Sequence, residues 1–343
     1  MTDTVFPVGV ATGVGSWPGV DPREAAAVVV GEAAQLPHLV ELPARGLGAD
    51  MIGRAAALLV DLPLDTSTTG YRVAQRTGPV TRLARDLLAR DLDALEEAWE
   101  LAGRRGSEQP VKVQAVGPLT LASQLELVGG HRALTDPGAL RDLTESLAEG
   151  LRGHVAEVRR RLGSPVLVQL DEPGLRSVLD GTLTGVSILQ TPRALPEPEA
   201  LAVLQQAIAT VPVPVLVHCC AASPPLDLLR RSGAAMVGLD AGVLRAADLD
   251  GVGELLDSGL SLALGLVPTA APERTPSWRE LARPAAVLVD RLGFPRSALA
   301  ERVLVTPACG LAGASGAWSR EALRRSAEIA RAFADGADLT AKD

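Results

Sequence analysis

Short apolar segments alternate with amphipathic segments along this chain of 343 residues, and this alternation constrains the fold more than any other feature. The apolar segments predict eight buried strands: Val10–Ser16, His38–Leu42, Val111–Val116, Val166–Asp171, Val213–Cys219, Ala235–Asp240, Leu260–Leu266 and Val303–Thr306. The amphipathic segments predict helices over Pro22–Leu36, Leu140–Leu162, Glu197–Thr210, Pro225–Ser232, Trp278–Leu292 and Ser319–Asp335. Near-continuous apolar strands that alternate with helices indicate an α/β fold with a covered parallel sheet. Eight such units favour a (β/α)8 TIM barrel over the alternative, a doubly wound open sheet.

One long segment interrupts this repeat. Pro43–Pro110 is too long for a single strand-helix unit, and within it Gly70–Arg76 predicts a strand or hairpin arm and Val80–Ala102 a helix. We therefore predict an insertion over residues 44–110, after the second strand, at the rim of the barrel. No Gly/Ser-rich linker divides the chain, so we expect a single barrel domain over residues 1–343.

Composition and charge exclude several classes of protein. A formal net charge of -8 argues against a nucleic-acid surface, which requires clustered Lys and Arg. No apolar run approaches the roughly 20 residues that span a bilayer, and residues 1–4 lack the basic start of a signal peptide. Three cysteines in a long chain do not form a disulfide framework. We expect a reduced cytoplasmic protein.

The three cysteines all lie at the ends of predicted strands. His218 and Cys220 are two residues apart on an extended segment, so both side chains point the same way. Cys219 points to the other side and is expected to be a buried filler. Asp240 ends the next strand, and Cys309 follows the last one. In a barrel the carboxyl ends of the strands share one face, and a ligand set of His218, Cys220, Asp240 and Cys309 suits Zn2+.

Further polar residues lie at the same predicted edge. The turn Gly13–Pro18 offers backbone N–H groups and the Ser16 hydroxyl, which can hold a carboxylate. Asp171 and Glu172 end one strand, where paired carboxylates can bind an ammonium group, shift each other's pKa or hold a helix N-terminus. Glu41 ends the second strand, and with Asp171 it can form an acidic cradle for a substrate amine.

Five motifs in this order carry a family resemblance: Val14-Gly15-Ser16-Trp17-Pro18, Gly117-Pro118-Leu119-Thr120, Gln169-Leu170-Asp171-Glu172-Pro173, His218-Cys219-Cys220 and Ala308-Cys309-Gly310-Leu311. Together they resemble the C-terminal catalytic domain of cobalamin-independent methionine synthase in a short, single-barrel form. The chain also resembles, more distantly, the uroporphyrinogen-decarboxylase-like barrels. The resemblance implies zinc held by His218, Cys220, Asp240 and Cys309. It also implies homocysteine bound by Val14, Gly15, Ser16, Glu41 and Asp171.

The chain departs from the family pattern in four places. Asp240 stands where the family has Glu, and Gln124 stands where a folate-stacking Trp is expected. The segment 265–271 lacks the family's proton-donor His, and the family's N-terminal folate-binding half has no counterpart in this sequence. The thiol side of the site is thus expected to be retained and the methyl-donor side altered. The donor is left open between folate, a corrinoid protein and another methyl donor.

The residues and the resemblance together favour a zinc-dependent thiol methyltransferase that converts homocysteine to methionine. One alternative is methyl transfer to another small thiol, and a second is a non-catalytic zinc or thiol-binding protein. A decarboxylase on a related barrel is disfavoured, because its carboxylate clamps would need more arginines than Arg23 and Arg45 near the N-terminus. No catalytic residue is predicted beyond the metal site.

Overall fold

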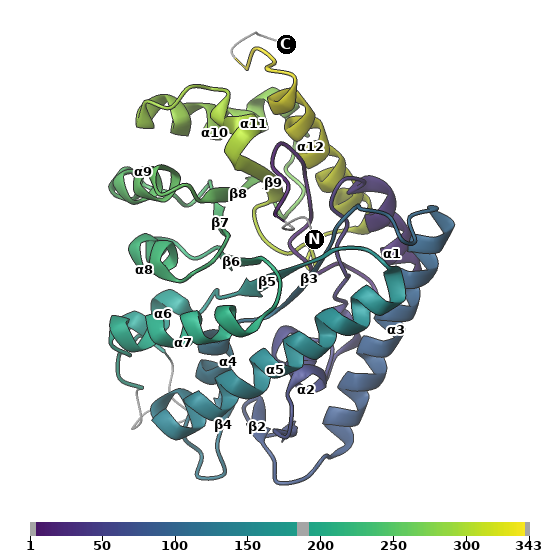
Figure 1. Ribbon diagram of the computed structural model, residues 1–343, viewed down its shortest axis with the longest axis vertical. Coiled ribbons are helices and arrows are strands. Elements are labelled where there is room, and N and C mark those ends of the chain that lie inside the picture. The colour runs from purple at the N-terminus through teal and green to yellow at the C-terminus, as the bar shows by residue number, and fades with distance from the viewer. Residues whose placement is uncertain (1–4, 184–191, 340–343) are drawn as a thin grey trace.

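A curled parallel sheet of six strands forms the centre of the fold, with helices packed around it (Figure 1). The computed structural model describes residues 5–183 and 192–339. In their order across the sheet, the strands are β3 (Val111–Val116), β5 (Val166–Asp171), β6 (Val215–Cys219), β7 (Met236–Asp240), β8 (Ser261–Val267) and β9 (Val303–Pro307). Every neighbouring pair is parallel. All six carboxyl ends therefore lie at one edge, where the predicted site residues are found.

The first two predicted strands are wrong as continuous strands. Val10–Ser16 and His38–Leu42 make only isolated parallel bridges, which pair Ala11 with Val305, Ser16 with Glu41 and His38 with Lys112. The Val14 carbonyl accepts hydrogen bonds from the side chains of Lys112 (3.0 Å) and Gln169 (2.8 Å) instead of from a neighbouring backbone. Gly15 has φ +152° and turns the chain away from a ladder. The bridges still link these segments to β9 and β3, which is consistent with a TIM-like barrel.

The helices, which lie outside the sheet, vary widely in length. They are α1 (Pro22–Glu32), α2 (Met51–Leu58), α3 (Pro79–Leu101), α4 (Pro118–Gln124), α5 (Pro137–Leu162), α6 (Leu175–Asp180), α7 (Glu197–Thr210), α8 (Leu226–Arg231), α9 (Leu249–Asp257), α10 (Trp278–Leu292), α11 (Ala298–Arg302) and α12 (Gly316–Ala334). Short 3-10 helices cover Pro43–Arg45, Ala133–Thr135 and Ala246–Asp248. In the described ranges, no helix has the length and apolar character to cross a membrane.

Capping residues explain where the helices begin and end. The predicted bounds of α10 are confirmed, because Ser277 and Glu280 form a capping box and Gly293 closes the helix in the left-handed conformation. The prediction for α12 began three residues late, because Ser315 is the N-cap and accepts a hydrogen bond from the Trp318 N–H.

The segment between the second predicted strand and β3 holds α2, α3 and two short strands. β1 (Leu64–Thr66) and β2 (Tyr71–Val73) are antiparallel, and β2 pairs in parallel with β4 (Leu125–Glu126). The predicted hairpin arm at Gly70–Arg76 thus contains β2, and the helix predicted over Val80–Ala102 is α3.

The concave face of the sheet is divided between an apolar end and a polar end. Near the amino ends of the strands a small core cluster gathers Leu167, Leu216, Met236, Ala263 and Leu304 around Phe6. Side chains two residues further along a strand share its face, so Gln169 and His218 lie on the same face, closer to the carboxyl edge. The apolar end of this face belongs to the hydrophobic core. The polar end carries buried side chains that can take part in binding or catalysis.

Candidate metal centre

His218, Cys220 and Cys309 meet at the carboxyl edge of the sheet. Their candidate ligand atoms all lie within 4.8 Å of one another. The Cys220 and Cys309 sulfurs are 3.1 Å apart, and both cysteines are free. His218 is buried and the two cysteines are half-buried. One imidazole and two thiols at this spacing are a donor set that fits a zinc ion. Cys219, on the other face of the same strand, is fully buried in the core, as predicted.

Asp171 fixes the orientation of the His218 ring. The His218 Nδ1 lies 2.8 Å from Asp171 Oδ1, and this oxygen also accepts a hydrogen bond of 2.7 Å from Gln169 Nε2. Burial acts to lower the pKa of His218, but the hydrogen bond and the charge of Asp171 and the charge of Cys309 outweigh it and raise that pKa. With Nδ1 engaged by a carboxylate, Nε2 is the nitrogen that can bind a metal.

The two thiols at the centre differ in acidity. Their mutual hydrogen bond lowers the pKa of Cys309 and raises that of Cys220. The nearby His218 charge also lowers the pKa of Cys309. Cys309 therefore ionises first, and a thiolate is the form in which cysteine binds metal.

Asp240, the fourth predicted ligand, does not join this group of three. It ends β7, and its Oδ1 accepts a 2.8 Å hydrogen bond from the Gly242 N–H. Burial raises the pKa of Asp240, and the Gly242 hydrogen bond and the charge of His218 act against that rise. Its assignment as a metal ligand stays a prediction.

The turn that carries Val14, Gly15 and Ser16 packs against the loop that carries Cys309. The Ser16 carbonyl accepts a 2.9 Å hydrogen bond from the Leu311 N–H. A Cβ added at Gly310 would lie 2.0 Å from Ser16 Oγ, and one added at Gly15 would lie 2.8 Å from the Gln114 side chain. Gly310 thus lets the Cys309 loop approach Ser16 closely, and Gly15 lets the turn approach Gln114 of β3.

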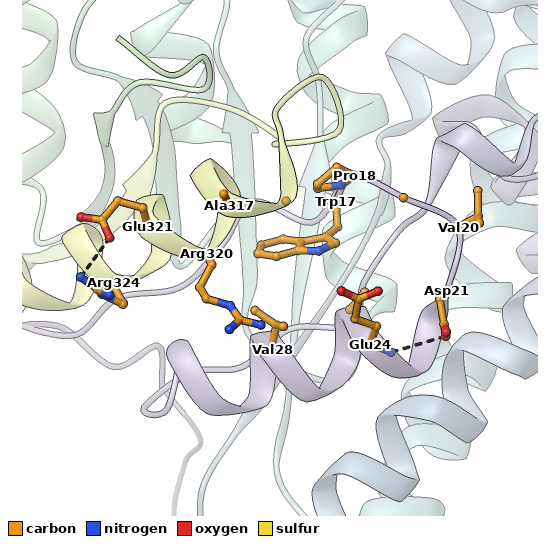
Figure 2. A pocket seen from close by; sticks show the side chains of 13 residues that line it. Trp17, Pro18, Val20, Asp21, Glu24, Val28, Ala317, Arg320, Glu321 and Arg324 are labelled. Atoms are coloured by element: carbon orange, nitrogen blue, oxygen red, sulfur yellow. Dashed lines mark hydrogen bonds and ion pairs between the residues drawn. The ribbon is translucent and has the colours of Figure 1, made fainter. Parts of the chain in front are cut away.

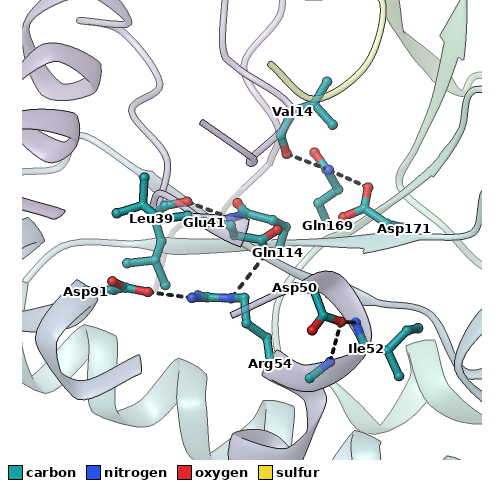
Figure 3. Close-up of polar contacts among 12 residues, drawn as sticks. Val14, Leu39, Glu41, Asp50, Ile52, Arg54, Asp91, Gln114, Gln169 and Asp171 are labelled. Carbon is teal, nitrogen blue, oxygen red and sulfur yellow. Dashed lines mark hydrogen bonds and ion pairs between the residues drawn. The ribbon is translucent and has the colours of Figure 1, made fainter. Parts of the chain in front are cut away.

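Glu41 lies in the same buried polar region as Asp171 (Figure 3). Arg54 Nε lies 3.5 Å from Glu41 Oε1, and Arg54 also pairs with the buried Asp91. Burial raises the pKa of Glu41; the charge of Arg54 opposes this, while the charge of Asp171 adds to it. The two carboxylates are therefore close enough for their charges to interact. The proposed contacts of Glu41 and Asp171 with an amine stay predictions.

Glu172, the other carboxylate predicted at the end of β5, holds the start of α4. Its Oε1 accepts from the Leu119 N–H (2.9 Å), and its Oε2 accepts from the Thr120 N–H (2.7 Å) and hydroxyl (2.6 Å). Burial is the main reason that its pKa rises to about 7. Three roles were considered for these two carboxylates: binding an ammonium group, shifting each other's pKa and holding a helix N-terminus. Glu172 holds a helix N-terminus, and Asp171 contacts His218.

Sequence reasoning missed the buried polar residues that support the site. Lys112, Gln114 and Gln169 lie on the concave face, and Arg54 comes from α2. Polar residues at alternate positions of a fully buried strand, such as Lys112 and Gln114 in β3, were the available signal. The sequence does not indicate a buried role for Arg54, because its charged partners, Glu41 and Asp91, are distant in sequence.

The chain has four histidines, and none of them lies in the loop at 265–271. His218 belongs to the group described above, His38 and His154 are buried, and His131 is exposed in the loop after β4. Gln124 is exposed at the end of α4.

A separate pocket of about 570 Å³ opens beside the site, between α1 and the start of α12 (Figure 2). Trp17, Val28 and Arg320 line it, and none of the predicted metal or substrate residues does. It is therefore distinct from the metal centre.

Comparisons with known proteins bear on this arrangement. The family model described as "Cobalamin-independent synthase, Catalytic domain" matches residues 9–332. Among solved structures, a methyltransferase from Methanosarcina mazei is similar at 14% sequence identity and a TM-score of 0.55, over 98% of this chain and 94% of its own. At this identity the likeness shows a shared fold. A 3-keto-D-glucoside 4-epimerase from E. coli matches at 10% identity over 71% of this chain and 86% of its own, but its TM-score of 0.38 is too low to indicate the same fold. A search of curated proteins found no match.

Proposed function

The chain belongs to the family of cobalamin-independent synthase catalytic domains, and on this premise we propose that it is a zinc-dependent methyltransferase that converts homocysteine to methionine. The observation that carries the proposal is the meeting of His218, Cys220 and Cys309 at the carboxyl edge of the sheet. We further propose that the fold is a closed (β/α)8 barrel in one domain over residues 1–343, with residues 44–110 as an insertion.

His218, Cys220 and Cys309 would hold the zinc ion, with Asp240 as the fourth ligand. A zinc ion bound there would lower the pKa of the substrate thiol, so that it reacts as a thiolate at neutral pH. Asp171 keeps the His218 ring in place through Nδ1. The loop at 265–271 holds no histidine that could accept the proton of the substrate thiol or protonate the departing methyl donor.

The substrate's amino acid group would be held on the other side of the same site. We assign its ammonium group to Glu41 and Asp171 and its carboxylate to the turn of Val14, Gly15 and Ser16. Support comes from the Ser16 turn, which packs against the Cys309 loop, and from the charges of Glu41 and Asp171, which influence each other. In the reaction the sulfur–methyl bond forms as the donor–methyl bond breaks, and the electron pair of the broken bond leaves with the donor.

A donor that needs no protonation on departure fits this chain better than polyglutamated methyl-folate. Gln124 and the loop at 265–271 lack the family's folate-stacking and proton-donating side chains. A methylated corrinoid protein is such a donor, because its corrinoid leaves without taking up a proton. The missing proton donor also favours one alternative, a non-catalytic protein that binds zinc and a thiol.

Turnover assays separate these functions. The purified protein is incubated with homocysteine and, in turn, methylcobalamin, a methylated corrinoid protein and methyl-folate, and methionine is measured. We expect methionine with at least one corrinoid donor. Tight homocysteine binding without methionine from any donor would favour the binding protein. Methylation of a different small thiol, without any methylation of homocysteine, would favour a methyltransferase that acts on that thiol.

A further inference from the structure

Lys112 is a cation that is fully buried under the site, at 0% exposure, on the concave face of β3. Its Nζ donates to three neutral acceptors: Gln169 Oε1 at 2.7 Å, the Val14 carbonyl at 3.0 Å and Gln114 Oε1 at 3.4 Å. These contacts use all three donors of the ammonium group. Lys112 is thus fully hydrogen-bonded without a direct contact to a carboxylate.

Two glutamine amides connect Lys112 to the two acidic residues of the site. The oxygen of the Gln169 amide accepts from Lys112, and its nitrogen donates to Asp171 Oδ1 at 2.7 Å. Gln114 Oε1 also accepts from Lys112, while its Nε2 donates to the Leu39 carbonyl at 2.6 Å; hydrogen bonding from the Gln114 side chain also acts to lower the pKa of Glu41. An amide presents an acceptor on one side and donors on the other. The lysine therefore turns the donor of Gln169 toward Asp171 and holds Gln114 beside Glu41.

The charge of Lys112 is retained in this setting. Burial lowers the pKa of Lys112 to about 8, and the charges of Asp171 and Glu41 act against a larger fall. The nearby His38 is held neutral, because burial and the Lys112 charge place its pKa well below the usual value. Lys112 is accordingly the cation that faces both carboxylates from inside the sheet, while Arg54 approaches Glu41 from α2.

We propose that Lys112 is a positioning residue that, through Gln114 and Gln169, holds Glu41 and Asp171 ready for a substrate ammonium group and makes the site select thiols that carry an amine. This inference rests on the proposed function. It extends that function by naming the residue that gives the amine cradle its geometry. The same lysine also holds the Val14 carbonyl, which ties the cradle to the turn assigned to the substrate carboxylate.

Selectivity between two thiols tests this proposal. Dissociation constants are measured for homocysteine and for 4-mercaptobutyrate, which is homocysteine without its amino group, in the zinc-loaded wild type and in Lys112→Met. Methionine is unbranched and only one atom shorter than lysine, and it lacks the charge and the donors. We expect homocysteine binding to weaken about tenfold or more, equivalent to roughly 1.4 kcal/mol, while 4-mercaptobutyrate binding changes less than about twofold.

Val113→Ala is the matched control, because Val113 is a fully buried neighbour on the opposite face of β3. It should lower thermal stability and leave the ratio of the two dissociation constants unchanged. Equal weakening for both thiols in Lys112→Met would mean that Lys112 has only a structural role, and the proposal would be wrong. If wild-type protein binds neither thiol, the proposed function itself fails and this inference fails with it.

A second variant applies if Lys112→Met does not fold. Gln169→Met keeps the lysine and its contact with the Val14 carbonyl but removes the amide that connects Lys112 to Asp171, so it should produce the same selective loss for homocysteine. If both variants fold, their effects on selectivity should not add, because they interrupt one chain of contacts. Fully additive effects, or unchanged selectivity in Gln169→Met, would contradict the proposal.

Discussion

At the scale of single residues, Asp171 shows how much of the site depends on shared contacts. The sequence predicts Asp171 as a substrate contact, and the structure also pairs it with His218 Nδ1. The two residues are register partners at the ends of β5 and β6. Orientation of a ligand histidine by a carboxylate usually strengthens metal binding. Asp171 thus connects the proposed metal ligand His218 to the proposed substrate contacts.

Asp171→Asn is expected to weaken zinc binding about 10- to 100-fold, the usual effect of losing such a partner of a ligand histidine. Competition with a chelator of known affinity, in the absence of any thiol, measures this change. Glu172→Gln is the control, because Glu172 is the next residue and its side chain holds the start of α4, while its backbone hydrogen bond to the His218 carbonyl is kept in the variant. It should reduce stability and leave zinc affinity unchanged. Unchanged zinc affinity in Asp171→Asn would show that the pair does not support the metal.

At the scale of elements, fully buried runs were the most predictable. The strand β3 is predicted with both ends correct, because all six of its residues are buried and a Pro and a Gly flank it. The predicted strand Val10–Ser16 overlaps the predicted turn Gly13–Pro18, and a continuous strand does not form, because the side chains of Lys112 and Gln169, which the sequence does not place there, donate to the Val14 carbonyl. His218, Cys220 and Cys309 could be predicted as candidate metal ligands from their residue types and spacing. Lys112 and Arg54 could not be predicted in this way, since their roles depend on partners distant in sequence.

Two glycines on α5 provide a test of how that helix packs. A Cβ added at Gly150 would lie 1.7 Å from the Leu58 carbonyl oxygen at the end of α2, whereas one added at Gly153 meets nothing within 4 Å. Gly153→Ala should therefore raise the free energy of unfolding by about 0.5–1 kcal/mol through helix propensity. Gly150→Ala should lower it by about 1–3 kcal/mol, because the backbones must separate. Denaturant unfolding measures both values, and changes of the same sign would contradict this packing of α2 against α5.

At the scale of the whole molecule, buried charges connect the segment before β3 to the sheet. Asp91 on α3 is fully buried and pairs with Arg45 (2.8 Å) and with Arg54 of α2. Arg54 in turn approaches Glu41 at the carboxyl edge. Breaking such a buried pair leaves an uncompensated charge. The position of Glu41 therefore depends on helices outside the parallel sheet.

The buried His154 makes global stability depend on pH. Burial is the main cause of its low pKa, about 4 against the usual 6.5, and the Arg54 charge adds to it. Because the pKa of His154 is lower in the folded protein than in the unfolded chain, the unfolded chain binds a proton at higher pH than the folded protein does. The free energy of unfolding therefore falls as the pH drops below about 6.5. Between pH 7 and pH 5, the wild type should lose about 2 kcal/mol more than His154→Gln. Urea unfolding at both pH values measures this difference, and parallel losses in the two proteins would show that His154 does not contribute.

Metal content is the decisive measurement for a zinc site formed by His218, Cys220 and Cys309. Elemental analysis is performed on purified wild type, Cys220→Ser and Cys309→Ser, with Cys219→Ala as the control, because Cys219 is buried on the other face of β6. We expect close to one zinc per chain in the wild type and in Cys219→Ala, and a loss of most of the zinc in both serine variants. Wild-type protein without zinc after exposure to the metal, or serine variants that retain it fully, would show that these residues do not form a zinc site.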